Sequence, residues 1–272
     1  MEHNNKIKIS VITTTFNSIK FLPYCIESIQ KQTYTNYEHI IINDGSSDGS
    51  KEYLDSISDE KIRVIHLPRS GRGKSLNKGL YESRGQYIAI LDADDISIST
   101  RLEVQKNILD SKPEYDLISS LFEIYKGTDA DKEKITNLID STLLNLKKLI
   151  SSDFIYTNPI CHSSVMMRKD IFKKVDNYDD RRTELFDFEL WIRMLITNKV
   201  KMYLITEALV FRNLHNQQYF ESKKRLRYLY QTYLLRRQVL GYMKYSYFYH
   251  IVIIFILFYG LLPRYIRKHF MN

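Results

Sequence analysis

Short apolar runs alternate with amphipathic stretches along the first hundred residues. The apolar runs are residues 7–13, 39–42, 62–67 and 87–91. The stretches with helical spacing are residues 21–30, 50–56 and 75–83. Strands and helices that alternate at this spacing predict βαβ units and a mostly parallel sheet. The pattern therefore predicts an α/β fold for this part of the chain.

Polar residues follow three of the predicted strands. Thr14 to Asn17 follow the first strand, Asn43 and Asp44 follow the second, and Asp92-Ala93-Asp94-Asp95 follow the fourth. Open α/β sheets bind ligands at the carboxyl ends of their strands, so Asp44, Asp92 and Asp94 should converge at one edge. Two aspartates one residue apart can share a divalent cation and the diphosphate it holds.

A glycine-rich stretch between the third and fourth strands offers an alternative. Gly71 to Ser75 reads GRGKS and matches the end of a P-loop, G-x-x-x-x-G-K-[ST]. The full pattern requires glycine at position 68, where this chain has Pro68. We therefore do not expect a nucleoside-triphosphate P-loop here.

Four pieces of the chain resemble family 2 glycosyltransferases, which are inverting enzymes that use nucleotide-activated sugars. The pieces read SVITTTFN, SIQKQTYTNYEHIIINDGSSDGS, GKSLNKGLYESRGQYIAILDADD and FDFELWIRM. Thr14 stands where the family usually has proline, and Asn43 where it usually has aspartate. The resemblance implies the GT-A fold, a mostly parallel Rossmann-like sheet flanked by helices. It further implies a catalytic domain over residues 1–215.

Within that domain, the resemblance divides the chain into two halves. Residues 1–100 form the nucleotide-sugar-binding half, and residues 101–215 form the acceptor-binding half. Residues 121–150 match no motif of the family, and we expect them to form a variable insert that faces the acceptor.

The resemblance also assigns donor-binding residues. Phe16 offers an aromatic face to the base, and the backbone around Thr15 and Asn17 offers hydrogen bonds. Asp44 would accept from the imino N–H of uracil or thymine. The alternatives are helix capping for Asp44 and Asp48, and turn formation for Asp95. Further residues expected to line the donor cleft are Gly73, Lys74, Asn77, Asp92 and Ala93.

By resemblance, Asp94 is the main metal ligand, and Asp92 binds either the metal or the ribose. Hard oxygen ligands suit Mg²⁺ or Mn²⁺. His215 is a further candidate ligand, although one extra residue separates it from Arg212 compared with the family's Tyr-Arg-x-His run. The alternative for His215 is a solvated loop histidine.

Acceptor chemistry is expected in the second half. Residues 158–166 predict a loop followed by a strand, with His162 lining the acceptor pocket. Residues 184–196 predict an amphipathic helix, and Asp187 at its start resembles the family's base, which deprotonates the acceptor hydroxyl. The alternative for Asp187 is an N-cap or first-turn acid that interacts with the helix dipole. Glu184 and Glu189 are the next candidates for the base.

The two cysteines, Cys25 and Cys161, do not suggest a disulfide framework. This usage favours a reducing compartment. Cys25 lies in an apolar helical stretch and is expected in the core. We expect no cleavable N-terminal signal, because the first strand begins almost at once.

Positive charge is concentrated at the C-terminal end of the chain. Residues 221–272 contain ten Lys or Arg against one acid, Glu221, although the whole chain carries only +8. Residues 247–262 carry no formal charge and are strongly apolar from Ile251 onward. This combination suits an anionic membrane surface better than nucleic acid.

We therefore expect residues 216–272 to form a basic helical tail that associates with a membrane. As a helix, residues 247–262 would extend about 24 Å, short of a hydrocarbon core of about 30 Å. Basic residues flank the stretch on both sides, which opposes clean spanning. A helix that lies in or dips into the inner leaflet is favoured, and a homodimerisation helix is the alternative.

Together these features predict a metal-dependent inverting glycosyltransferase that faces the cytosol at the inner membrane. The donor would be a nucleoside-diphosphate sugar, with a UDP-sugar favoured. The acceptor would be a lipid-linked glycan or a polysaccharide in bacterial surface-glycan assembly. Two alternatives remain, a catalytically inert sugar-nucleotide-binding subunit and a nucleotidyltransferase.

Overall fold

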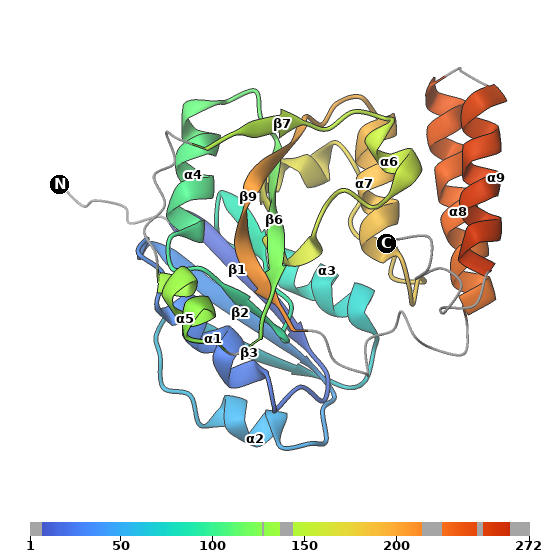
Figure 1. Cartoon of the computed structure of the whole chain (residues 1–272). Coiled ribbons are helices and arrows are strands. Elements are labelled where there is room, and N and C mark those ends of the chain that lie inside the picture. The colour runs from blue at the N-terminus through green and yellow to red at the C-terminus, as the bar shows by residue number, and fades with distance from the viewer. Residues whose placement is uncertain (1–6, 127, 137–143, 214–224, 244–246, 262–272) are drawn as a thin grey trace.

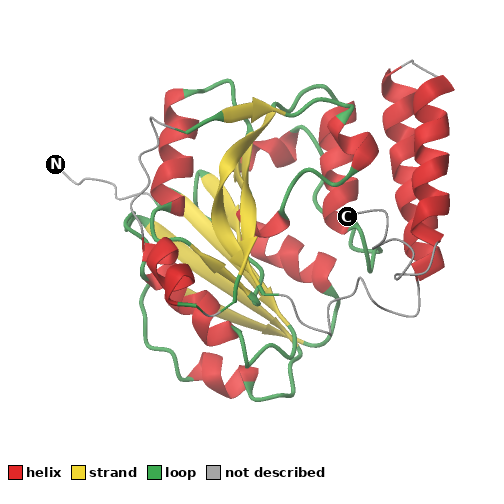
Figure 2. Cartoon of the chain, in the orientation of Figure 1, coloured by secondary structure: helices red, strands yellow, loops and turns green. Residues whose placement is uncertain are grey.

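A single mixed sheet forms the centre of the molecule, and helices cover both of its faces (Figure 2). The computed structural model describes residues 7–126, 128–136, 144–213, 225–243 and 247–261 (Figure 1). The strands in these ranges form a nine-stranded sheet of order β3-β2-β1-β4-β8-β6-β9-β5, with β7 paired to β9.

The first half of the sheet is parallel, as its βαβ pattern predicts. Strand β1 pairs in parallel with both β2 and β4, and β2 pairs in parallel with β3. The observed boundaries lie within three residues of those predicted. The elements are β1 Ile9–Thr15, α1 Leu22–Gln30, β2 Tyr37–Asp44, α2 Ser50–Asp55, β3 Ile62–Leu67, α3 Arg72–Glu82 and β4 Tyr87–Ile90.

The second half of the sheet is mixed. Strand β8 is antiparallel to both β4 and β6, whereas β9 is parallel to β6 and antiparallel to β5 and β7. The strands are β5 Asp95–Ser97, β6 Leu117–Ile124, β7 Leu146–Lys148, β8 Met166–Arg168 and β9 Met202–Arg212. The helices are α4 Arg101–Ser111, α5 Asp129–Thr136, α6 Asp153–Tyr156 and α7 Phe186–Ile196.

The strand predicted within residues 158–166 begins only at its last residue. Residues His162–Ser164 instead form a 3₁₀ turn, which the Ser164 N–H closes by donating to the Cys161 carbonyl at 3.0 Å. The Ser164 hydroxyl donates to the same carbonyl at 2.9 Å, and this local bond competes with strand pairing. The turn directs the His162 and Ser163 side chains toward the aspartates that follow β4.

The two faces of the sheet bury separate hydrophobic cores. Ile12 of β1 packs with residues of α3 and α7, whereas Val11 packs on the opposite side with residues of α1 and α4. Alternate strand residues point to opposite faces, so continuous apolar strands supply both cores. Cys25 is fully buried in the second core, as its apolar surroundings predict.

The C-terminal segment packs beside α6 and α7. Helices α8, Arg225–Met243, and α9, Tyr247–Leu261, form a hairpin whose long axis runs along that side of the molecule (Figure 1). Leu235, Val239 and Ile253 are buried in the same core as α7. None of the helices in the described part of the chain combines the length and apolar character that crossing a bilayer requires.

Candidate functional site

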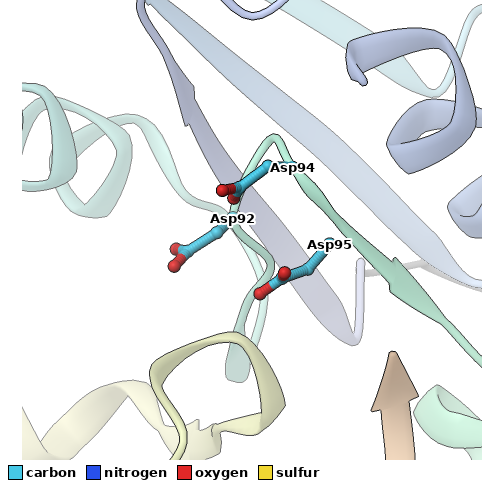
Figure 3. A group of neighbouring side chains, drawn as sticks. All are labelled: Asp92, Asp94 and Asp95. Atoms are coloured by element: carbon cyan, nitrogen blue, oxygen red, sulfur yellow. The ribbon is translucent and has the colours of Figure 1, made fainter. Parts of the chain in front are cut away.

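Three carboxylates gather in the turn that joins β4 to β5. Side-chain oxygens of Asp92, Asp94 and Asp95 all lie within 4.8 Å of one another (Figure 3). Leu91 and Ala93 are buried on either side of Asp92, which fixes the turn against the core. The turn therefore presents the aspartates together at the carboxyl end of a central parallel strand, where α/β sheets bind ligands.

Asp92 is held between two cationic or polar partners. Its carboxylate forms an ion pair with Arg72 and a hydrogen bond at 3.0 Å with Nδ1 of His162. Burial opposes ionisation, but the charges and hydrogen bonds of Arg72 and His162 hold the pKa of Asp92 well below its usual range. Asp92 is therefore a fixed negative charge.

Asp95 has the opposite electrostatic environment. It is the first residue of β5, only 2% exposed, and it accepts a hydrogen bond from Ser163 Oγ. Burial first, and then the charges of Asp94 and Asp92, raise its pKa well above the usual range. Arg212 Nε is 3.9 Å from its carboxylate, too far for a hydrogen bond. The charges of Asp92 and Asp94 thus add to burial in disfavouring ionisation of Asp95.

This donor set fits a hard divalent cation. Three carboxylates supply oxygen ligands of the kind that Mg²⁺ and Mn²⁺ prefer. The backbone carbonyl of Asp94 is itself held by the Asn213 amide at 2.5 Å, which ties the turn to the end of β9. The described cluster contains both predicted ligands, Asp94 and Asp92, and adds Asp95, for which the sequence suggested only a turn.

Asp187 approaches the same region from α7. The helix begins at Phe186, and Leu185 occupies the N-cap position without a side-chain capping bond. Asp187 is thus a first-turn residue, and its carboxylate accepts from Asn158 Nδ2 at 3.1 Å. Among the described residues, the hydrogen bond of the Asp187 carboxylate is therefore with Asn158, and not with the backbone of α7 that it could have capped.

Arg72 links the carboxylate cluster with Asp187. Its guanidinium lies 5.0 Å from the ring centroid of Phe186, while it forms the ion pair with Asp92. Desolvation of the guanidinium opposes its charge, but the negative charges of Asp92, Asp94 and Asp187 raise the pKa of Arg72. Arg72 is therefore a permanent cation within electrostatic reach of both acidic groups.

His162 connects the carboxylate cluster with the buried aromatic side chains around α7. Its Nδ1 contacts Asp92, and its Nε2 lies 3.1 Å from the Tyr178 hydroxyl. The imidazole ring also packs against the rings of Phe186 and Trp191. His162 is buried in this chain of contacts, which fixes the orientation of Asp92.

The ends of β1 and β2 form a second polar area of the candidate site. Thr15 is buried, and its Oγ1 forms no hydrogen bond among the described residues. The Phe16 ring is 41% exposed, and the Arg69 guanidinium lies 3.6 Å from its centroid. Asn17 Oδ1 accepts from the Ser47 N–H at 2.8 Å, which joins the two strand ends.

Asp44 organises the loop that leads into α3. Its buried carboxylate forms an ion pair with Arg69 and accepts from the N–H and Oγ of Ser70 at 2.7 and 2.8 Å. The Gly71 N–H donates to it at 3.0 Å. Asn43 pairs with His66 Nδ1 at 3.0 Å instead. Asp44 thus connects the predicted nucleobase pocket with Gly71, the residue that precedes Arg72.

The three α3 residues predicted to line the donor cleft have different environments. Asn77 clamps the backbone of Tyr178, donating to its carbonyl at 2.9 Å and accepting from its N–H at 3.0 Å. Gly73 allows close packing, because a Cβ there would lie 2.9 Å from the Asp180 Cα. Lys74 is exposed. Gly73 and Asn77 therefore hold the segment that carries Tyr178 against α3.

Other sequence-based candidates are engaged elsewhere. Glu189 forms two bonds of 2.9 Å with Arg193, and Glu184 forms an ion pair with Arg227 at 3.2 Å. His215 lies outside the described residues. Inside the GRGKS stretch, Ser75 Oγ donates to the Gly71 carbonyl, as a helical residue does. This stretch leads into and forms the first turn of α3.

Comparisons with known sequences and structures identify the family and the fold of the chain. The family model described as glycosyl transferase family 2 matches residues 10–176. The chain belongs to glycosyl transferase family 2. An uncharacterized glycosyltransferase of Methanocaldococcus jannaschii is 31% identical to this family 2 chain, covering 85% of it and 79% of the relative. Glycosyltransferase GlyG of Streptococcus pneumoniae is also 31% identical, covering 75% of the chain and 68% of the relative.

A solved structure has the same fold. The crystal structure of S. aureus TarS 1–349 in complex with UDP-GlcNAc superposes with a TM-score of 0.68 over 86% of this chain and 66% of that chain. At 17% sequence identity, this similarity concerns the fold alone. The α/β fold of GT-A type, predicted from the motifs, is thereby confirmed.

Proposed function

We propose that this protein transfers a sugar from a nucleoside-diphosphate sugar to an acceptor hydroxyl, with inversion at the anomeric carbon. The observation that carries the proposal is the arrangement of acidic groups around Arg72. A three-carboxylate cluster follows β4, Asp187 begins α7, and Arg72 interacts with both. The carboxylate cluster suits a metal-bound diphosphate, and Asp187 suits the role of general base.

UDP is the favoured nucleotide. Phe16 offers a partly exposed ring, and the buried hydroxyl of Thr15 has an unused hydrogen-bonding capacity among the described residues. Both lie at the strand ends that the family resemblance assigns to the base. S. aureus TarS, which shares the fold, has been crystallised with UDP-GlcNAc and with UDP.

In the proposed reaction, Asp187 accepts the proton of the acceptor hydroxyl as its oxygen attacks the anomeric carbon. The bond between that carbon and the diphosphate oxygen breaks, and the diphosphate leaves from the opposite face. Mg²⁺ or Mn²⁺ held by Asp92, Asp94 and Asp95 would offset the charge that develops on the leaving group. Asn158 orients Asp187, and Arg72 adds a second positive charge near the diphosphate.

The proposed acceptor is a lipid-linked glycan or a polysaccharide in bacterial surface-glycan assembly, at the cytoplasmic face of the membrane. The basic, apolar α8–α9 hairpin supports this acceptor class, because it packs directly on α7, the helix that carries Asp187. A membrane-held acceptor would reach Asp187 from that side.

The test is a product assay with a panel of UDP-sugars and Mn²⁺. Release of UDP, together with an inverted anomeric centre in the product by NMR, supports the proposal. Release of pyrophosphate would identify a nucleotidyltransferase instead. Tight UDP-sugar binding without hydrolysis or transfer to lipid-linked acceptors would identify an inert binding subunit.

A further inference from the structure

One face of α9 carries large apolar side chains that are exposed in the described structure. Its exposed apolar residues are spaced three and four positions apart, so they form a single stripe along the helix. Their side chains are between 42% and 67% exposed. This apolar face of α9 consists of Phe248, Ile251, Ile254, Phe255, Phe258 and Leu261.

The opposite face of α9 is packed against the protein. Ile253 is 1% exposed and belongs to the main core, and the Tyr249 ring contacts Tyr156 of α6. Gly260 allows α8 to approach closely, because a Cβ there would lie 2.5 Å from Leu229 Cδ2. The helix is therefore fixed flat against the domain, and the stripe points away from it.

A contiguous exposed stripe of this kind marks an interaction surface. Its surroundings in the sequence are strongly basic. Residues 221–272 contain ten Lys or Arg and one acid, and Lys244, Arg264 and Arg267 lie within a few positions of the ends of α9. The net charge of this part of the sequence disfavours association with a second copy of the same segment and favours an anionic partner.

We propose that the apolar face of α9 docks on an anionic lipid bilayer, with the helix in the plane of the surface. Aromatic and aliphatic side chains would enter the boundary between headgroups and acyl chains, and the basic residues would contact anionic headgroups. The packed inner face keeps the helix parallel to the surface.

Docking would also orient the candidate site, an extension that rests on the proposed function. Helix α8 is fastened to the segment before α7 by the Arg227–Glu184 ion pair at 3.2 Å, and to α6 by Arg236, which donates to the Tyr156 carbonyl at 3.0 Å. Asp187 lies three residues after Glu184 in the chain. Docking of α9 would therefore hold the proposed base close to acceptors embedded in the same bilayer.

Vesicle flotation of the full chain tests the docking directly. We expect the protein to float with phosphatidylglycerol vesicles, and binding to weaken at least tenfold with neutral phosphatidylcholine or in 0.5 M NaCl. Charges at a surface are screened over about 8–10 Å at physiological ionic strength, so salt removes the electrostatic part. Phe255→Ser/Phe258→Ser should weaken flotation at least tenfold.

The matched control removes exposed aromatic residues elsewhere. Tyr24→Ser/Tyr81→Ser changes side chains that are 56% and 82% exposed on α1 and α3, and it should float like the unaltered protein. Thermal midpoints verify folding, and Ile251→Ser replaces the double variant if its midpoint falls. Flotation requires no sugar donor. A protein that floats with vesicles but shows no turnover would therefore support membrane docking and contradict the proposed function.

Two results would overturn the docking. One is a vesicle assay in which the full chain does not bind, or in which Phe255→Ser/Phe258→Ser floats as well as the unaltered protein. The other is a salt-insensitive dimer, measured by light scattering, that Phe255→Ser/Phe258→Ser converts to monomer. That result would assign the face to a second copy of the chain.

Discussion

Asp92 and Asp95 are three residues apart, yet their surroundings shift their pKa values in opposite directions. Arg72 and His162 hold Asp92 ionised, whereas burial and the neighbouring aspartates disfavour ionisation of Asp95. Like charges crowded at one point favour a bound cation, which stabilises all three ionised forms together. These opposite pKa shifts therefore support a metal-binding role for the cluster, in addition to the number of oxygen ligands that it offers.

Asp94→Ala tests that role. Removal of one of three carboxylates should abolish the Mn²⁺ dependence of UDP binding, and turnover should fall to near background. Isothermal titration of UDP with and without Mn²⁺ measures the first effect, independently of activity. Asp170→Asn is the matched control, because this carboxylate is 74% exposed and forms an ion pair with Lys173 on the surface. A folded Asp94→Ala protein that retains metal-dependent binding would remove Asp94 from the site.

The sequence identifies the residues of this site whose role follows from local pattern. Asp92 and Asp94 are recognisable because they follow an apolar run. Asp95 and Arg72 are not, because their environments depend on distant contacts. Asp95 is buried by β9 and Ser163, and Arg72 crosses to Asp92 from a stretch that resembles a P-loop. Only the fold supplies those contacts.

At the scale of elements, the β1–β2 pair buries a histidine. His39 is fully buried, and its Nε2 lies 2.9 Å from Thr13 Oγ1. Burial lowers the pKa of His39 to about 3 from an ordinary value of 6.5. The unfolded chain therefore binds a proton below pH 6.5 that the folded chain excludes until about pH 3.

Stability should consequently fall as the pH drops below 6.5. One such histidine reduces the free energy of unfolding by up to about 1.4 kcal/mol per pH unit. Urea denaturation at pH 7.0 and 5.5 should show this loss in the unaltered protein and a smaller one in His39→Leu. His250→Leu, which changes an exposed histidine, should behave like the unaltered protein. Equal pH dependence of His39→Leu and the unaltered protein would contradict the assignment.

Elements of the first half are predictable because each is defined by its own sequence. Apolar runs bounded by Gly, Asn and Asp give strands β1 to β4, and the helical stretches between them make the connections long enough for parallel crossovers. The elements of the second half are harder to predict from the sequence. Strands β7 and β8 are three residues long, and β8 follows a 3₁₀ turn that side-chain hydrogen bonds of Ser164 stabilise. Tertiary contacts decide such short elements.

At the scale of the whole molecule, the α8–α9 hairpin shares its core with the catalytic fold. Leu235 is 1% exposed and lies in the same cluster as Trp191, the single tryptophan of the chain. Leu235→Ala should lower the free energy of unfolding by about 2–5 kcal/mol, the usual cost of such a cavity. Trp191 fluorescence during urea denaturation reports this change from within α7.

The same experiment distinguishes a shared core from an independent tail. With a shared core, the Trp191 transition should shift to lower urea concentration and coincide with the transition followed by circular dichroism. Leu226→Ala provides the control, because this α8 residue is 71% exposed. A Trp191 transition unaffected by Leu235→Ala would indicate that the hairpin unfolds separately.

The most direct test of the proposed reaction is the turnover of Asp187→Asn with a UDP-sugar, Mn²⁺ and a lipid-linked acceptor. Asparagine retains the shape and the contact with Asn158 but cannot take a proton. General-base catalysis contributes about 10²–10⁴ in rate, so turnover should fall by that factor while UDP affinity is unchanged. Turnover within a few-fold of the unaltered enzyme would contradict the account and would leave Asp187 only the role of a first-turn acid at the helix dipole.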